Sequence, residues 1–242
     1  MVDIGQYNAY LVDRTITPNE IITVNNWLEG AASPTYVRQQ DSFKTITITL
    51  IVEGNSEQDV AYNISQVINT FREIKQLEFE DMPDFIFPAA LEGLPEIERL
   101  KPCVMKVTLT FKGNYMRTTD EKVIEPDILD SGTFTFTVGG TAPTPLRIEF
   151  TPISSAIVTV HVAGLVKGGF TVRNVPAGST LVIDTENGEV NLVDNTTNIA
   201  TPAIDCYQDA WELPVAEPGT YTVTLDFHSG YNIKVKYHEN YV

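Results

Sequence analysis

Threonine and isoleucine alternate at residues 45–49, within an apolar run at 43–52. A repeat of two residues places alternate side chains on opposite faces of a strand, so this run predicts a strand with one buried face. Shorter apolar or alternating runs at 77–80, 85–91 and 104–111 predict further strands. The first half of the chain is therefore expected to consist mainly of β-strands.

One segment of the first half has a different period. Its apolar residues recur at steps of 4, 3, 1, 3 and 3, which is the spacing of a helix with one apolar face. Ser56 with Asp59, or Asn55 with Gln58, supplies an N-cap and a partner like that of a capping box. We expect a single long helix at about 57–75, packed on the neighbouring strands. Its apolar face comprises Val60, Ile64, Val67, Ile68, Phe71 and Ile74.

The second half contains short alternating runs, with turn signals between them. A turn every 8–12 residues is typical of a β-sandwich. Asn187-Gly188, between two apolar runs, is a strong hairpin signal. We expect strands at 133–138, 146–150, 157–163, 169–173, 180–184, 188–193, 220–227 and 231–237.

A polar, acidic stretch separates the two halves. It includes Thr118-Thr119-Asp120-Glu121-Lys122 and Glu125-Pro126-Asp127. We therefore predict a β domain with one helix at 1–120, a linker at 121–131 and a β-sandwich at 132–242.

The charge of the chain narrows the classes of partner. Its 242 residues include 16 Lys and Arg and 32 Asp and Glu, so the net charge is −16. This charge opposes nonspecific binding to nucleic acid or to an anionic membrane surface. We find neither a signal peptide nor a run of 18 apolar residues, and we expect a protein that is made in a cytoplasm and stays soluble.

Residues with catalytic or metal-binding chemistry are scattered. Cys103 and Cys206 form no CxxC pair and are expected to be buried. No histidine has metal-site spacing, and neither a phosphate-binding glycine loop nor a Ser/His/Asp set is recognisable. Asp184, Glu186, Asp194 and Asp205 leave a calcium site open as the less favoured alternative. We expect no enzyme, metal or cofactor. The histidines are His161, His228 and His238.

Three aromatic residues are candidates for contacts. Trp211 precedes a Pro-Gly turn and, with Tyr207, is a candidate for stacking on a sugar or for contacting a protein partner. A tryptophan at such a position also packs often at a sandwich edge. Trp27 is a candidate core or inter-subunit contact.

The ordered set of segments resembles the distal tail proteins (Dit) of siphophages along essentially the whole chain. In the first half it comprises Phe43-Lys44-Thr45-Ile46-Thr47-Ile48, Leu77-Glu78-Phe79-Glu80-Asp81-Met82-Pro83 and Ala90-Leu91-Glu92-Gly93. In the second half it comprises Gly140-Thr141-Ala142-Pro143-Thr144-Pro145, Trp211-Glu212-Leu213-Pro214 and Ile233-Lys234-Val235-Lys236-Tyr237.

This resemblance implies a mostly β fold. The N-terminal domain is expected to be a β-sandwich or split barrel with one α-helix, and the C-terminal domain a galectin-like or carbohydrate-module-like β-sandwich. Larger members insert an extra sugar-binding module, for which 242 residues leave no room.

The resemblance also implies a place in the virion, at the distal tip of the tail. Six copies are expected to close into a ring that continues the tail-tube protein and holds the tip protein that bears the tail-associated lysin. The C-terminal domains often carry receptor-binding proteins. DNA is expected to pass through the lumen without specific binding, and no membrane is involved.

Two rival functions remain open at this point. A carbohydrate-binding adhesion module would use Trp211 and its neighbours. A major tail-tube protein, which is also β-rich with one helix, would form open polymers instead of discrete rings.

Overall fold

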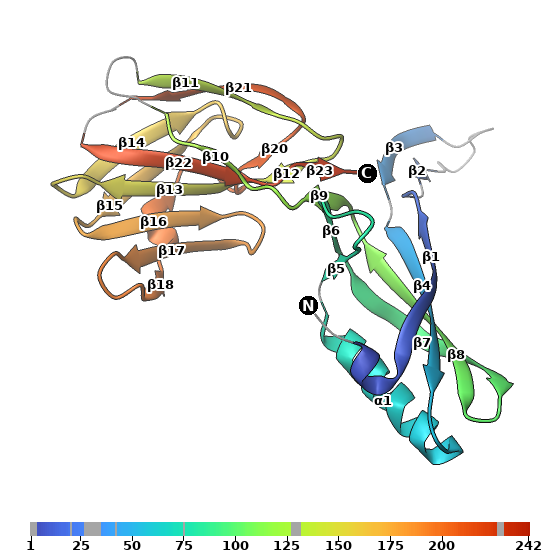
Figure 1. Cartoon of the computed structure of the whole chain (residues 1–242). Helices are drawn as coiled ribbons and strands as arrows, with labels where there is room; N and C mark the ends of the chain where they lie inside the picture. Colours follow the sequence, from blue (N-terminus) through green and yellow to red (C-terminus); the bar gives the residue numbers. More distant parts are fainter. Residues whose placement is uncertain are drawn as a thin grey trace. The chain divides into compact units, whose positions relative to one another are not determined.

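The computed structural model describes residues 4–19, 21–26, 35–41, 43–74, 76–126, 132–226 and 230–242, with only the backbone for 21–26 and 35–41. The chain forms two compact units, Met1–Arg117 together with Val242, and Thr118–Tyr241. Both are built mainly of antiparallel strands, and one long helix lies in the N-terminal unit, as the sequence predicts (Figure 1).

The centre of the N-terminal unit is an antiparallel sheet in the order β1-β4-β8-β7. Its core strands are those with the clearest alternation, and Ile48 of β4 lies opposite Leu109 of β8. The strands are β1 (Ala9–Thr17), β4 (Lys44–Glu53), β8 (Val104–Gly113) and β7 (Ala90–Lys101).

Helix α1 (Glu57–Glu73) covers one face of this sheet (Figure 1). Ser56 caps it, because its Oγ accepts a hydrogen bond of 3.1 Å from the backbone N–H of Asp59. The carboxylate of Asp59 in turn accepts the backbone N–H of Asn55 at 3.1 Å. The predicted helix is confirmed, and it ends at Glu73 because Ile74 is extended.

The apolar face of α1 meets alternate residues of β4 and β8. Phe71 packs edge to face on Phe111, with ring centroids 5.7 Å apart. Burying each such side chain contributes about 1.5–3 kcal/mol. The buried set comprises Val60, Ile64, Val67, Phe71, Ile46, Ile48, Leu50, Val52, Val107, Leu109 and Phe111.

The N-terminal unit contains elements that the sequence patterns miss. Strand β1 and the β2–β3 pair lie in a segment with no expected strand, because its polar and apolar residues do not alternate clearly. The elements missed in this way are η1 (Ile4–Tyr7), β2 (Ile21–Asn26), β3 (Thr35–Asp41) and β9 (Met116–Thr118). The runs expected at 77–80 and 85–91 do form strands, β5 (Gln76–Glu78) and β6 (Phe85–Pro88), which pair with each other.

The C-terminal unit is a sandwich of two antiparallel sheets around one apolar core. One sheet has the order β10-β22-β13-β16-β17-β18 and the other β11-β21-β14-β15-β19. The first comprises β10 (Lys122–Ile124), β22 (Tyr231–Tyr237), β13 (Arg147–Pro152), β16 (Ser179–Asp184), β17 (Glu189–Asp194) and β18 (Ala200–Pro202). The second comprises β11 (Thr133–Val138), β21 (Gly219–Leu225), β14 (Ile157–Ala163), β15 (Phe170–Val175) and β19 (Tyr207–Gln208).

The hairpin at Asn187-Gly188 is confirmed. Asp184 lies opposite Glu189, and Gly188 has a φ of +69° in the turn. The Asp184 carboxylate accepts the backbone N–H of Asn187 at 3.1 Å, which closes this turn.

The linker prediction needs a correction. Within 121–131, the segment Lys122–Ile124 forms strand β10 and pairs with β22, so that Val123 lies opposite Lys236. Three residues are too few to show alternation, which is why the sequence hides this strand. Other short elements are β12 (Thr144–Pro145), η2 (Ile204–Cys206), β20 (Val215–Ala216) and β23 (Asn240–Tyr241).

Candidate assembly surfaces

The two outer strands of the N-terminal sheet expose apolar side chains. Strand β1 lies at one edge of this sheet and β7 at the other. An exposed edge strand with apolar side chains is a site at which another chain can pack. On β1 the exposed residues are Tyr10, Leu11 and Val12, and on β7 they are Leu94, Ile97 and Leu100.

Each edge contains a bulge that turns an apolar residue outward. On β7 the register shifts between Glu92 and Glu96, and Leu94 within this bulge is 93% exposed. Gly93 has a φ of +72°, a conformation that glycine adopts without strain. On β1 the register shifts between Leu11 and Asp13, and Val12 is 57% exposed. The bulges interrupt the edges and at the same time present Val12 and Leu94 to solvent.

The face of the sheet opposite α1 is rich in threonine. The register aligns Thr47 of β4 with Thr15 on β1 and Thr110 on β8. Ion pairs join the adjacent β8 and β7 on this face, one between Lys106 and Glu98 at 3.1 Å. The face therefore presents neutral hydroxyls, charges paired between β7 and β8, and the carboxylates of Asp13 and Glu96, which lie opposite Thr49 and Thr108. Its threonines are Thr15, Thr17, Thr45, Thr47, Thr49, Thr108 and Thr110.

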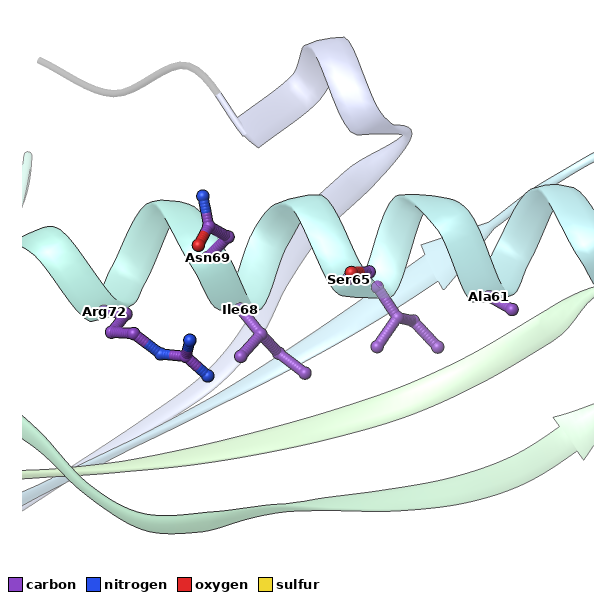
Figure 2. Close-up of a pocket in the computed structure, with 6 residues that line it drawn as sticks. Ala61, Ser65, Ile68, Asn69 and Arg72 are labelled. Atoms are coloured by element: carbon purple, nitrogen blue, oxygen red, sulfur yellow. The ribbon is translucent and has the colours of Figure 1, made fainter.

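A depression of about 350 Å³ follows one flank of α1. Figure 2 shows Ile68 and Arg72 directed toward the strands and Asn69 directed away from them. Every residue that lines the depression comes from this helix, and no convergent set of polar groups closes it, so it lacks the form of a ligand site. The lining residues are Ala61, Ile64, Ser65, Ile68, Asn69 and Arg72.

In the C-terminal unit, Trp211 and Tyr207 have opposite environments. The Trp211 side chain is fully exposed, with a relative accessibility of 104%. Tyr207 is buried, and its ring lies 4.9 Å from that of Phe170. Of the two residues, only Trp211 offers a ring face to a partner. The Tyr207 side chain instead supports the loop that carries Trp211.

The support consists of one hydrogen bond in a buried setting. The Tyr207 hydroxyl donates to the backbone carbonyl of Glu212, the residue after Trp211. Burial, with a smaller contribution from the Glu212 carboxylate, raises the pKa of the Tyr207 hydroxyl from 10.0 to about 12. The hydroxyl therefore remains a donor well above neutral pH.

Trp27 lies outside the described residues, directly after β2. Its expected role in the core or between subunits stays a prediction.

Two of the acidic residues considered for calcium, Asp184 and Asp194, have other hydrogen-bond partners. The Asp194 carboxylate accepts backbone N–H groups of Thr196 and Thr197, both at 2.8 Å, and these bonds lower the pKa of Asp194. Across the described part of the chain, no three side chains of His, Cys, Asp or Glu gather where they would hold a metal ion.

The described histidines lie at hydrogen-bonding distance from neighbouring oxygens, and the two cysteines differ in burial. His161 Nδ1 lies 3.3 Å from the Thr171 hydroxyl, and His238 Nδ1 lies 2.8 Å from the carbonyl of Thr118. His228 is not among the described residues. Cys206 is buried, whereas Cys103 is only half-buried, contrary to the expectation for it. None of the helices within the described ranges has the length and apolar character needed to cross a bilayer.

Solved structures share this fold along the full chain. The Dit protein of SPP1, described as a paradigm of the hub of the adsorption apparatus in phages that infect Gram-positive bacteria, aligns with a TM-score of 0.73 at 12% identity. The alignment covers 100% of this chain and 96% of that chain. A chain of the phage P2 baseplate in its activated conformation with calcium aligns with a TM-score of 0.53 at 8% identity and covers 98% of this chain and 92% of its own.

The same baseplate with strontium gives a TM-score of 0.53 at 9% identity, over 97% of this chain and 92% of that one. No protein-family model and no curated protein sequence matches the chain. The likeness is therefore one of fold, over the residues of both units. The chain has the fold of the siphophage distal tail protein, Dit.

Proposed function

We propose that this chain is a structural protein of a phage tail, and that six copies form a ring at the distal end of a long, non-contractile tail. The ring joins the tail-tube protein to the tip protein that carries the tail-associated lysin and to receptor-binding proteins. The protein is made in the host cytoplasm and resides in the virion. It acts by assembly and uses neither a catalytic residue nor a cofactor.

The position of the exposed apolar residues is the observation that carries this proposal. Val12 and Leu94 lie on opposite edges of one sheet, and the two edges have different sequences. A closed ring needs two different surfaces that fit each other, repeated in every copy. Packing β1 of one copy against β7 of the next buries both sets of apolar side chains and covers both free edges.

The threonine-rich face fits the lumen of such a ring. When the sheets of neighbouring copies meet edge to edge, α1 covers one side of the joined sheet and the threonines face the other. Hydroxyls, carboxylates and Lys side chains paired with Glu offer DNA no cluster of free Lys and Arg to bind. We therefore place this face toward the lumen, where DNA passes without specific binding.

Charge-introducing variants at the two edges test the proposal. Val12→Asp damages the β1 edge and leaves β7 intact, whereas Leu94→Asp does the reverse. Each variant alone is expected to be monomeric, because every contact in the ring needs both edges. When the two are mixed, one competent contact remains, between β1 of the Leu94→Asp chain and β7 of the Val12→Asp chain. The mixture is therefore expected to yield heterodimers and no rings.

Native mass spectrometry of each variant and of the mixture measures this outcome. Val158→Asp is the matched control, because Val158 is 75% exposed on β14 of the C-terminal unit. The control is expected to form rings like the parent chain. Rings from either edge variant alone, or monomers only in the mixture, would overturn the proposed contact. Long tubes from the parent chain would instead identify a tail-tube protein.

A further inference from the structure

The segment from the end of β18 to the first residue of β20 carries three exposed apolar side chains. Ile204 is 61% exposed, Trp211 104% and Val215 44%. A fully exposed indole packs on nothing in its own chain, although tryptophan gains more than most residues from burial. Isolated exposed apolar residues are ordinary, but three within twelve residues make this segment a candidate for contact with a partner.

The segment is nevertheless held firmly to the sandwich. Ala210 and Leu213, on either side of Trp211, pack against the apolar core. The carbonyl of Pro214 accepts the backbone N–H of Leu146 at 3.2 Å and the hydroxyl of Thr185 at 2.9 Å. Together with the Tyr207 bond to the carbonyl of Glu212, these contacts fix the loop on both sides of the indole. A loop whose backbone is fixed before binding loses little backbone conformational entropy when a partner covers it.

The charge around Trp211 is negative. Residues 174–233 contain nine Asp and Glu and no Lys or Arg. Asp205, Asp209, Glu212 and Glu217 lie within six residues of Trp211 in the chain, and all four are exposed. Among the described residues, the one cation within 4 Å of any of these carboxylates is Arg173, whose nitrogen lies 3.9 Å from Asp209. The exposed apolar residues are therefore bordered by carboxylates, most of which have no cation nearby.

We propose that this segment, which we call the Trp211 surface (Ile204, Asp205, Asp209, Trp211, Glu212 and Val215), docks another protein of the tail. The partner presents an apolar pocket that receives the indole, with Lys or Arg side chains at its rim. This inference rests on the proposed place of the chain in a phage tail. The alternative occupant, a host sugar, fits less well, because sugar platforms combine a ring with convergent hydrogen-bonding groups in a hollow.

Photocrosslinking in assembled tails tests the docking directly. Trp211 is replaced by p-benzoylphenylalanine in the phage-encoded chain, purified virions are irradiated, and crosslinked peptides are identified by mass spectrometry. We expect crosslinks to a peptide of a different tail protein, with Lys or Arg next to the crosslinked residue. Crosslinks only to copies of this chain, or none at all, would overturn the proposal.

Variant virions provide the second readout. In particles with Trp211→Ala or Glu212→Lys, quantitative mass spectrometry is expected to show the crosslinked protein reduced roughly tenfold or more, as for the loss of an interface hot spot. Val158→Ala and Glu80→Lys are the matched controls, because both positions are exposed and Glu80 lies in the other unit. Equal loss in the controls would contradict the proposal.

Two further outcomes separate this proposal from the proposed function. Trp211 is fully exposed, so Trp211→Ala is expected to unfold at the same temperature as the parent chain. If variant particles keep their full protein composition but no longer adsorb to cells, Trp211 contacts the host and the protein-docking proposal fails. If the parent chain itself is absent from purified virions, the tail function fails as well.

Discussion

Arg14 on β1 binds Asp81 through two parallel hydrogen bonds of 2.8 and 2.7 Å. The same guanidinium lies 4.2 Å from the centre of the Phe79 ring. Arg14 thereby ties an edge strand of the main sheet to the turn that follows β5. This connection fixes the position of β1, the strand that we place at the contact between copies.

The Arg14 connection predicts a difference between two basic residues. Arg14→Lys keeps the charge but loses the paired geometry and the planar contact with Phe79. We expect Arg14→Lys to lower the unfolding temperature of the free chain by nearly as much as Arg14→Ala. Differential scanning calorimetry measures both. Full retention of stability by Arg14→Lys would show that charge alone matters at this position.

The ion pair between Asp81 and Arg14 is expected to make the stability of the fold depend on pH in the acid range. Hydrogen bonds from Arg14 hold the pKa of Asp81 below its ordinary value of 3.8. A carboxylate with a lowered pKa in the folded state stabilises the fold above its ordinary pKa, and that contribution disappears as the pH falls through the lowered pKa. Asp81→Asn is therefore expected to lose less stability than the parent chain when the pH falls from 5 to 3. Thermal unfolding across this range checks the prediction, and parallel curves would contradict it.

The packing of α1 on the sheet predicts that one substitution on its buried face strongly lowers the free energy of unfolding. Phe71 is buried against Phe111, whereas Tyr62 on the same helix is 62% exposed. Phe71→Ala is expected to cost about 3–5 kcal/mol in the free energy of unfolding, because it leaves a cavity. Tyr62→Ala is expected to change it by less than about 0.5 kcal/mol. Urea unfolding monitored by circular dichroism distinguishes the two, and similar costs would contradict the packing of α1.

Tyr207 predicts a response to alkali. Burial raises its pKa from 10.0 to about 12, so its contribution to stability is complete below pH 10 and is lost as the pH rises toward 12. Tyr207→Phe removes one hydrogen bond, at a cost of about 1 kcal/mol near neutral pH. Because the variant has no hydroxyl there, the gap between the two chains is expected to narrow above pH 10. Unfolding titrations at pH 8 and pH 11 measure this gap, and a constant gap would contradict the environment of Tyr207.

The elements that could be predicted from the sequence are those whose burial alternates. Ile46 and Ile48 face the core while Thr45 and Thr47 do not, so β4 is visible as a pattern. Helix α1 is likewise visible because its buried residues recur at helical spacing. The hairpin is visible because Asn187-Gly188 is a local turn signal.

The candidate surfaces could not be predicted in this way. The sequence of β7 contains Gly93-Leu94-Pro95 among charged residues and shows no strand pattern. Most side chains of this edge strand are exposed, so apolar residues do not recur at every second position. Tyr207 and Trp211 looked equivalent in the sequence, although only the fold shows which one the core covers. Contacts between distant segments decide both cases, and local spacing does not contain that information.

The charge of the chain predicts how the assembly responds to salt. Each copy carries a net charge of −16, so closing a ring brings like charges together. At about 0.15 M salt the screening length is ~8 Å, and at 0.01 M it is ~30 Å. Rings are therefore expected to dissociate as salt is removed and to form again when it is restored. Analytical ultracentrifugation at several salt concentrations checks this, and rings that dissociate on adding salt would contradict apolar contacts.

The most direct measurement of the central claim is the mass of the purified parent chain near physiological salt, combined with negative-stain imaging of the same sample. The proposed ring predicts six copies of the 26.9 kDa chain in a closed particle with a central hole. A stable monomer at high concentration, or long open tubes, would contradict it.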